Sequence, residues 1–554
     1  MADLKKCNLT DWLLLGALLA VGGFHEFISA ALAVVFAVYL IVLVKKNKGL
    51  AWKDTALSWA LLVLVVLYGI SALWAVDSGM AFIGFLKFLP VFLYLLILRQ
   101  TGQGNVTRIL PIFGAVSVVI SAVCMQLPVL ENFFGVVGRL AGFFQYPNTY
   151  GLFLLVCQLL LLKKGIKKWD FLTLAVLLGG FLYTGSRTVF VLAVLVNVAW
   201  FAIGGRKRLW VVLAICGVLA LGAVMVLLWG EGTVLYRYLK ISVTQSTFMG
   251  RILYMIDSLP LLVRYPLGMG FMGYQFTQGS VQTGVYSVAY VHNDILQVFL
   301  DVGWIGGGVF LGALIRYFCR KDISWREKLI PGTIVAHSLF DFDLQFVAIF
   351  MLLVVLMEPE QGSCSASSKV NTIKQGAFAL VAAVCLYMGV TLGLSYFECR
   401  TVAQMLYPYN SMNMVQMLQQ EVDLDKANGL ADQILAQNDH CFGAYSVKSK
   451  YAYSQGDFSQ LIYYKRLALA ENPFEQTEYV EYCQMLMNGI AVYEQNGDNQ
   501  SADICRQELV AVYTQFSQNR HRLSYLGSRI DTQPVLKLPE AIVSYVEAIG
   551  EGTP

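Results

Sequence analysis

The chain has 554 residues, of which 57% are hydrophobic and only 14% charged, and its net charge is +4. This composition is typical of a membrane protein with many spans and excludes an ordinary soluble globule. So small a net charge gives no reason to expect nucleic acid as a partner.

Apolar runs of roughly 17–25 residues can cross the hydrocarbon core of a bilayer, and shorter runs can do so inside a bundle. The sequence therefore predicts an all-α membrane bundle of about 12–13 spans within residues 1–397. No cleavage site of the A-x-A kind follows the first span, so we expect that segment to remain in the protein. In chain order the predicted spans are 12–21, 27–44, 56–73, 82–98, 109–127, 148–162, 171–183, 189–203, 209–228, 295–317, 329–340, 344–357 and 376–394.

Lysine and arginine cluster in alternate loops, for example at residues 45–53, 163–168, 206–208 and 316–328. Basic loops of membrane proteins stay in the cytoplasm, so these loops are assigned to that side. The long loop at about residues 229–292 and everything after residue 397 are then predicted to be extracytoplasmic.

Residues 398–554 form a second predicted domain, polar in composition and helical in pattern. It holds 19 acidic and 11 basic residues, a balance of −8, so residues 1–397 carry +12. The segment 434–438 (ILAQN) recurs as 468–472 (ALAEN), an offset of 34 that resembles a tetratricopeptide repeat. Such repeats stack into a concave surface for a protein partner. An irregular helical bundle is the other interpretation.

The 11 cysteines are scattered and form no C-x-x-C pair, which gives no support to a zinc or redox site. Neither a metal nor a cofactor is predicted. Cys399, Cys441, Cys483 and Cys505 fall in the tail, where an extracytoplasmic location would permit disulfides.

Candidate functional residues gather on the predicted outer side. Ionisable residues in or beside a span are costly, so they suggest function. Arginine suits phosphate because its guanidinium donates two parallel hydrogen bonds and stays charged. A histidine such as His292 can take a proton from an attacking hydroxyl. The structural alternatives are arginines that reach lipid headgroups and a histidine that merely caps a helix. The outer set is Arg139, Arg187, Arg251, His292 and His337.

Two further features are interpreted as structural. Gly268, Gly270 and Gly273 spell G-x-G-x-x-G, but no strand leads into them, so a flexible turn is predicted and not a nucleotide site. Lys87 lies within an apolar span near Pro90 and is expected to line a cavity or to point to the interface.

The order and spacing of several short motifs resemble the O-antigen ligase and O-antigen polymerase family of bacterial membrane glycosyltransferases. The resemblance extends to about residue 357. The motifs are Trp74-Ala75-Val76-Asp77, Gly138-Arg139, Pro147-Asn148, Gly185-Ser186-Arg187, Arg251 before Pro266-Leu267-Gly268, His292-Asn293, and His337 with Asp341-Phe342.

The resemblance implies a glycan donor on undecaprenyl pyrophosphate, transferred to a saccharide or cell-wall acceptor at the outer face of the bacterial cytoplasmic membrane. It implies no metal or nucleotide. Arg187 and Arg251, with Arg139, would hold the pyrophosphate, and His292 would activate the acceptor hydroxyl. The supporting residues would be Asn148, Asn293, His337 and Asp341. A polymerase and a ligase both fit.

Two other functions remain open at this point. A transporter or flippase for lipid-linked saccharides would share the spans and a basic cavity, although no duplicated half is evident. A scaffold whose tail recruits partners would need neither so many spans nor outward arginines.

Overall fold

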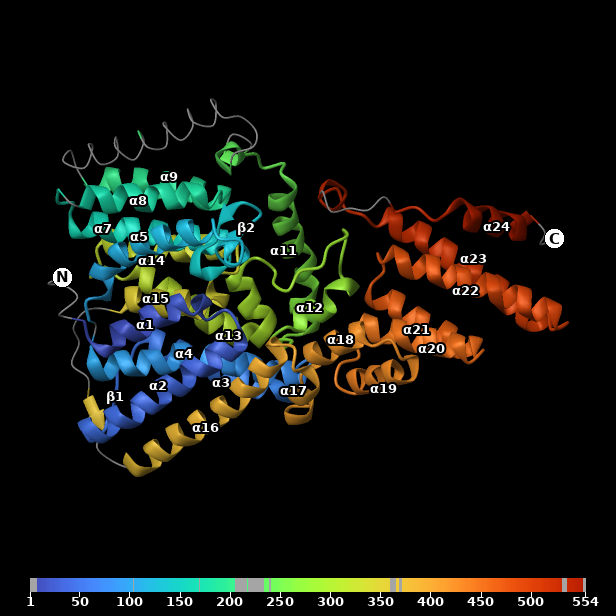
Figure 1. Cartoon of the computed structure of the whole chain (residues 1–554), viewed down its shortest axis with the longest axis horizontal. Helices are drawn as coiled ribbons and strands as arrows, with labels where there is room; N and C mark the ends of the chain where they lie inside the picture. The colour runs from blue at the N-terminus through green and yellow to red at the C-terminus, as the bar shows by residue number, and fades with distance from the viewer. Residues whose placement is uncertain are drawn as a thin grey trace.

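The computed structural model describes residues 7–102, 104–168, 170–204, 217, 234–238, 241–358, 365–367, 371–530 and 536–551. Helices dominate these residues, as predicted. Figure 1 shows the helices of the first part of the chain packed side by side as a bundle, from which the helices of the tail extend to one side. Between the two lie α11 (Ser246–Arg264) and α12 (Gly273–Thr277).

Six helices of the described residues are long and apolar enough to cross a membrane, and four shorter apolar helices accompany them, so the protein is a multi-pass membrane protein. The six are α2 (Glu26–Asn47), α3 (Ala56–Ile70) continued by η3 (Ser71–Leu73), α4 (Ser78–Thr101), α5 (Val106–Cys124), α13 (Asp294–Cys319) and α16 (Asn371–Tyr396). The four are α1 (Leu9–Leu19), α8 (Asp170–Tyr183), α9 (Arg187–Gly204) and α15 (Val347–Met357).

The predicted count of about thirteen spans is confirmed in part. Ten predicted spans fall on these ten helices. Two others coincide with α7 (Pro147–Lys164) and α14 (Trp325–Ser338), which are not among the apolar helices above. The predicted span 209–228 lies outside the described residues.

Short irregular elements connect the helices at the end of the bundle that faces the tail. A hairpin pairs β2 (Gly135–Val136) with β3 (Arg139–Leu140), and its two turn residues, Val137 and Gly138, have φ angles of 49° and 71°. Positive φ at both turn positions is the geometry of the tightest hairpins. The others are η2 (Val21–Gly23), α6 (Glu131–Phe134), η4 (Gly142–Phe144), η6 (Val234–Tyr238), η7 (Gln278–Ser280) and η8 (Asp343–Gln345). At the opposite end, β1 (Leu50–Trp52) pairs with β4 (Ser365–Ser367).

The G-x-G-x-x-G segment is a packed turn, so the prediction of a flexible one is wrong. Gly268 and Gly270 have φ angles of 89° and 79°. The Gly270 N–H donates to the Asp301 carbonyl at 2.9 Å, and a β-carbon on Gly268 would overlap the same carbonyl. The segment fits closely against α13, where that helix kinks at Gly303.

The tail consists of helices joined by tight turns, one of which covers residues 455–457. Gly456 and Gly497 each take positive φ in such a turn, followed by the capping residues Asp457 and Asp498. The tetratricopeptide interpretation stays a prediction, since α22 and α23 are 20 and 23 residues long against 13 and 14 for α20 and α21. The tail elements are α17 (Arg400–Leu406), α18 (Ser411–Gln420), α19 (Leu424–Leu435), α20 (Phe442–Ser454), α21 (Phe458–Glu471), α22 (Gln476–Gln495), α23 (Asn499–His521), η9 (Gly527–Arg529) and α24 (Glu540–Glu551).

All four tail cysteines singled out above are free thiols.

The tail is docked on the loop that contains α11 and α12. The Ser524 N–H donates to the Thr283 carbonyl at 2.9 Å, and Ile530 packs in a cluster with Leu253 of α11. At the other end of α11, the Tyr265 hydroxyl lies 3.3 Å from Nε2 of His440. The tail therefore holds α11 at both of its ends.

Candidate active site

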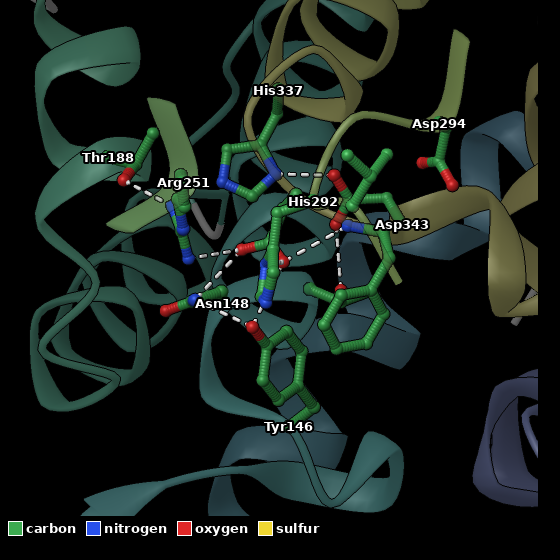
Figure 2. Close-up of polar contacts among 12 residues, drawn as sticks. Tyr146, Asn148, Thr188, Arg251, His292, Asp294, His337 and Asp343 are labelled. Atoms are coloured by element: carbon green, nitrogen blue, oxygen red, sulfur yellow. Dashed lines mark hydrogen bonds and ion pairs between the residues drawn. The ribbon is translucent and has the colours of Figure 1, made fainter. Parts of the chain in front are cut away.

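Most of the residues singled out in the sequence converge from separate segments at the end of the bundle that faces the tail (Figure 2). Arg251 lies in the second turn of α11, and each of the others lies at or just beyond the beginning or end of a secondary-structure element. They are Arg139 of β3, Asn148 of α7, Arg187 of α9, Arg251 of α11, His292 just before α13, and Asp341 just after α14.

The Asp341 carboxylate is the centre of this cluster and is fully buried. Its Oδ2 accepts hydrogen bonds from Nη2 of Arg251 and Nδ2 of Asn148, both at 2.9 Å. Its Oδ1 accepts one from the Tyr146 hydroxyl at 3.0 Å and lies 3.2 Å from Nδ1 of His292. One carboxylate thus joins four segments of the chain.

Electrostatics keep this cluster charged. Burial alone would raise the pKa of the Asp341 carboxyl, but Arg251 and His292 lower it by more, so this pKa lies well below its ordinary value. Burial also opposes charge on Arg251, yet Asp341 raises the pKa of Arg251 above its ordinary 12.5. The two groups therefore form an ion pair throughout the physiological range.

His292 is held in a strained but defined position. Its φ is 55°, a left-handed conformation that is uncommon outside glycine and persists mainly where function requires it. Its ring contacts Tyr254 and Phe342, with centroids 5.9 and 4.9 Å away. Because a carboxylate can only accept, the proton lies on Nδ1, and Nε2 is left with a lone pair. This ring can therefore accept a proton from a hydroxyl group.

Arg139 supports the cluster from the β2–β3 hairpin. Its Nε donates to the Thr184 carbonyl at 2.7 Å, and its Nη2 donates to Oδ1 of Asn148 at 2.8 Å. Burial and the nearby Arg237 lower the pKa of Arg139 to about 10, so the group stays cationic at neutral pH. Asn148 links this arginine to Asp341.

A pocket of about 540 Å³ adjoins the cluster. Its polar wall contains four guanidinium groups, a density of positive charge that favours an anionic ligand. Its other wall is apolar and includes residues of α9 such as Leu195, which is 62% exposed on the bundle surface. The pocket thus combines a cationic wall with an apolar one. The arginines are Arg139, Arg187, Arg237 and Arg251.

Four of the predicted site residues make no hydrogen bond with Asp341 among the described residues, and one of them, Arg139, is linked to it only through Asn148. Arg187 lies across the pocket, where its Nη2 donates to Thr247 at 3.1 Å. The Asn293 side chain caps α13 by accepting from the Leu296 N–H at 2.9 Å. His337 pairs with Asp343, at 2.5 Å between Nδ1 and Oδ2.

Sequence reasoning missed Arg237, Tyr146 and Asp343. Arg237 is a basic residue in a loop assigned to the outside, where the positive-inside rule does not account for it. A basic residue on that side could therefore have been recognised as a candidate for binding an anion. Tyr146 and Asp343 carried no signal beyond their proximity in sequence to Asn148 and Asp341.

Over the described residues, no group of three or more histidine, cysteine, aspartate or glutamate side chains is arranged to hold a metal ion.

Comparison with known proteins identifies one family. Residues 172–311 match the family model described as O-antigen ligase. The matched stretch contains Arg187, Arg251 and His292, whereas Arg139, Asn148 and Asp341 lie outside it. No curated protein and no solved structure matches the chain. The match confirms the resemblance drawn from the sequence and implies, at the level of the family, a membrane glycosyltransferase.

Proposed function

We propose that this chain, a membrane glycosyltransferase of the O-antigen ligase family, transfers a glycan from undecaprenyl pyrophosphate to an acceptor hydroxyl at the outer face of the cytoplasmic membrane. The observation that carries the proposal is the four-arginine pocket next to the His292–Asp341 pair. A neutral solute would not require such a concentration of guanidinium groups.

The pocket suits a lipid diphosphate in both of its parts. Arg187 and Arg251 would bind the diphosphate oxygens, with Arg139 behind them. The exposed apolar residues of α9 continue from the pocket onto the bundle surface, so a polyprenyl chain could leave the pocket without passing through water. One wall of the pocket would thus bind the diphosphate of the donor, and the adjoining wall would contact its polyprenyl chain.

His292 would act as the general base. Its Nε2 takes the proton of the acceptor hydroxyl while that oxygen attacks the anomeric carbon of the donor sugar. The bond from that carbon to the diphosphate oxygen breaks, and the electron pair leaves with the diphosphate, whose charge the arginines stabilise. A direct displacement of this kind inverts the anomeric centre.

Asp341 would position both partners. By accepting from Nδ1 of His292 it holds the ring in the tautomer that presents a basic Nε2, and by pairing with Arg251 it fixes the guanidinium beside the pocket. Tyr146 and Asn148 in turn hold the carboxylate.

We also propose the domain arrangement predicted from the sequence. Residues 1–397 would form the membrane domain, and residues 398–554 an extracytoplasmic helical domain that resembles tetratricopeptide repeats and offers a surface to a protein partner. The docking of this tail on the loop that contains α11 supports a common side for both.

The test is the length profile of surface polysaccharide in cells whose sole copy carries Arg251→Ala. Loss of long chains with single repeats still attached would indicate a polymerase. Loss of all attached glycan, with lipid-linked chains accumulating, would indicate a ligase. Arg264→Ala, in the last turn of the same helix but outside the pocket, is the matched control and should leave the profile unchanged.

An unchanged profile in Arg251→Ala would refute the transferase. The variant His292→Ala distinguishes glycosyl transfer from the alternative function, transport of lipid-linked saccharides. Removing a base should abolish glycosyl transfer in purified protein while leaving lipid translocation in vesicles intact.

A further inference from the structure

His337 occupies a second histidine–aspartate pair beside the first. Its Nδ1 lies 2.5 Å from Oδ2 of Asp343, and both side chains are fully buried. Oδ1 of Asp343 accepts from the Thr149 hydroxyl at 2.7 Å. The ring is therefore fixed in orientation, with Nδ1 bound to the carboxylate.

Among the described residues, no group forms a hydrogen bond with the other ring nitrogen of His337, Nε2, although this atom is buried. Figure 2 shows it on the side of the ring where Arg251 and Thr188 lie, and all three residues line the arginine pocket. A buried polar atom without a partner is unfavourable, so a hydrogen-bonding group that reached this atom from the pocket would be stabilised there.

The two pairs differ in the charge available to the histidine. The negative charge of Asp341 is shared with Arg251, Asn148 and Tyr146 as well as with His292. The hydrogen bonds of the Asp343 side chain go only to His337 and to the neutral Thr149, among described residues. Asp343 can therefore compensate a full positive charge on its histidine, which Asp341 cannot. Neighbouring groups whose environments differ in this way commonly take opposite protonation states.

We propose that His337 is a further donor-binding residue, which as an imidazolium donates its Nε2–H to a diphosphate oxygen. The proposal rests on the function proposed above and adds to it a histidine whose protonation is linked to binding of the anion. Burial and Arg251 oppose a positive ring, although Asp343 raises the pKa of His337 above its ordinary value. A diphosphate bound beside the arginines would raise this pKa further, so rings that are neutral before binding would take up a proton from solvent.

The charged groups facing His337 bear on any pH dependence. From the segment that follows its own helix, α14, these are Asp341 and Asp343, and from α11 Arg251. Arg187 of α9, Arg139 of β3 and Arg237 of η6 line the same pocket. Of these groups, only the histidine is expected to change charge near neutral pH.

The test compares His337→Asn with His337→Gln. Asparagine places its amide nitrogen near the position of Nδ1, so it keeps the contact with Asp343 and lacks the donor toward the pocket. Glutamine places its amide nitrogen near the position of Nε2 and keeps that donor without a charge. The two variants therefore separate binding from a merely structural role.

The measurement is calorimetric titration of the full-length detergent-solubilised protein with farnesyl diphosphate near neutral pH. His337→Asn should weaken binding roughly 10- to 100-fold, the effect of losing one charge-assisted hydrogen bond, and His337→Gln should weaken it less. Titration in buffers of different ionisation enthalpy should show that the unaltered protein takes up more protons on binding than His337→Gln.

Tight binding by His337→Asn with weak binding by His337→Gln would overturn the inference, because it would leave His337 with the sole role of holding Asp343. Equal binding by all three proteins would overturn it too, while the proposed donor site would stand. No binding of farnesyl diphosphate by the unaltered protein would instead refute the donor class itself, and the inference with it.

Discussion

Arg251 and His292 contact opposite oxygens of one carboxylate. Nη2 of Arg251 lies 2.9 Å from Oδ2 of Asp341, and Nδ1 of His292 lies 3.2 Å from Oδ1. The group proposed to bind the leaving diphosphate and the group proposed to activate the acceptor are therefore held in a fixed relation by a single buried side chain. Any change at that side chain should disturb both halves of the reaction.

Asp341→Asn tests this coupling directly. The amide can no longer compensate Arg251, nor select the Nδ1–H tautomer of His292. We expect glycosyl transfer to fall by a factor on the order of 10² to 10⁴. Because a nearly buried guanidinium loses its counter-charge, stability should also fall, by about 3–5 kcal/mol. Transfer assays and thermal unfolding of purified protein measure the two effects.

Asp322→Asn is the control for that substitution. Asp322 forms an exposed ion pair with Arg320, precedes the end of α14 opposite to His337, and does not line the pocket. Asp322→Asn should change neither glycosyl transfer nor the stability of the protein measurably. If Asp341→Asn kept full transfer activity, Asp341 could not be the residue that orients the base.

The sequence identified candidate residues better than the way in which they meet. Arg251 and His292 stood out because charged side chains beside apolar spans are costly, whereas Asp341 was included only through the family resemblance. Their meeting was not predictable from spacing, because it depends on how α7, α11, α13 and α14 pack. Arg237 became part of the site only through the fold of a loop.

The boundaries of the membrane bundle were predictable for the long helices and less so for the short ones. The segment that forms α4 is apolar over nearly its whole length, so its sequence alone predicts a membrane-spanning helix. α14 contains Arg326, Glu327 and Lys328 in its first turn, so hydropathy alone describes it poorly. Its burial comes from neighbours that the local sequence does not specify.

Lys87 shows how an intramembrane charge can serve structure. Its Nζ donates to the Phe24 carbonyl at 2.8 Å and to Glu26 at 3.2 Å, and it lies 3.4 Å from the hydroxyl of Tyr290, two residues before His292. The side chain is fully buried within the bundle and does not extend to its surface. Lys87→Met removes these bonds and leaves the partners unpaired, so we expect a loss of about 1–3 kcal/mol in the free energy of unfolding. Chemical denaturation in detergent measures it.

Lys45→Met, at the exposed C-terminal end of α2, is the matched substitution and should have little effect. Equal stability of the two variants would mean that the bonds of Lys87 contribute nothing net.

Close approach between the tail and the long loop depends on glycine. A β-carbon on Gly279 of η7 would overlap the carbonyl oxygen of Glu471, at the end of α21. We expect Gly279→Ala to force the two backbones apart, at a cost of about 1–3 kcal/mol, and to lower transfer activity through the loop that contains α11. Hydrogen exchange across residues 246–291 should increase.

Gly443→Ala provides the comparison, because nothing lies within 4 Å of a β-carbon at that position in the tail. Its exchange and activity should match those of the unaltered protein. Unchanged exchange in Gly279→Ala would show that the loop keeps its conformation without this contact.

The joint between His440 and α11 should depend on pH. The hydrogen bond with Glu471 raises the pKa of His440 above its ordinary 6.5, although partial burial acts in the opposite direction. Asp439 also favours the charged ring, and Arg264 of α11 opposes it. A raised pKa in the folded protein means that the stabilisation is complete below pH 6.5 and is lost as the pH rises through the higher folded value.

His440→Asn removes the titrating ring and keeps, near the position of Nδ1, an amide that can donate to Glu471. The melting temperature of the unaltered protein should therefore exceed that of the variant near pH 6, and the difference should shrink as the pH is raised past the folded pKa of His440. The difference should be modest, because the pair is partly exposed and screened by solvent. A difference that grew with pH would contradict the assignment, since it would mean that the neutral ring, and not the charged one, holds the tail against Tyr265.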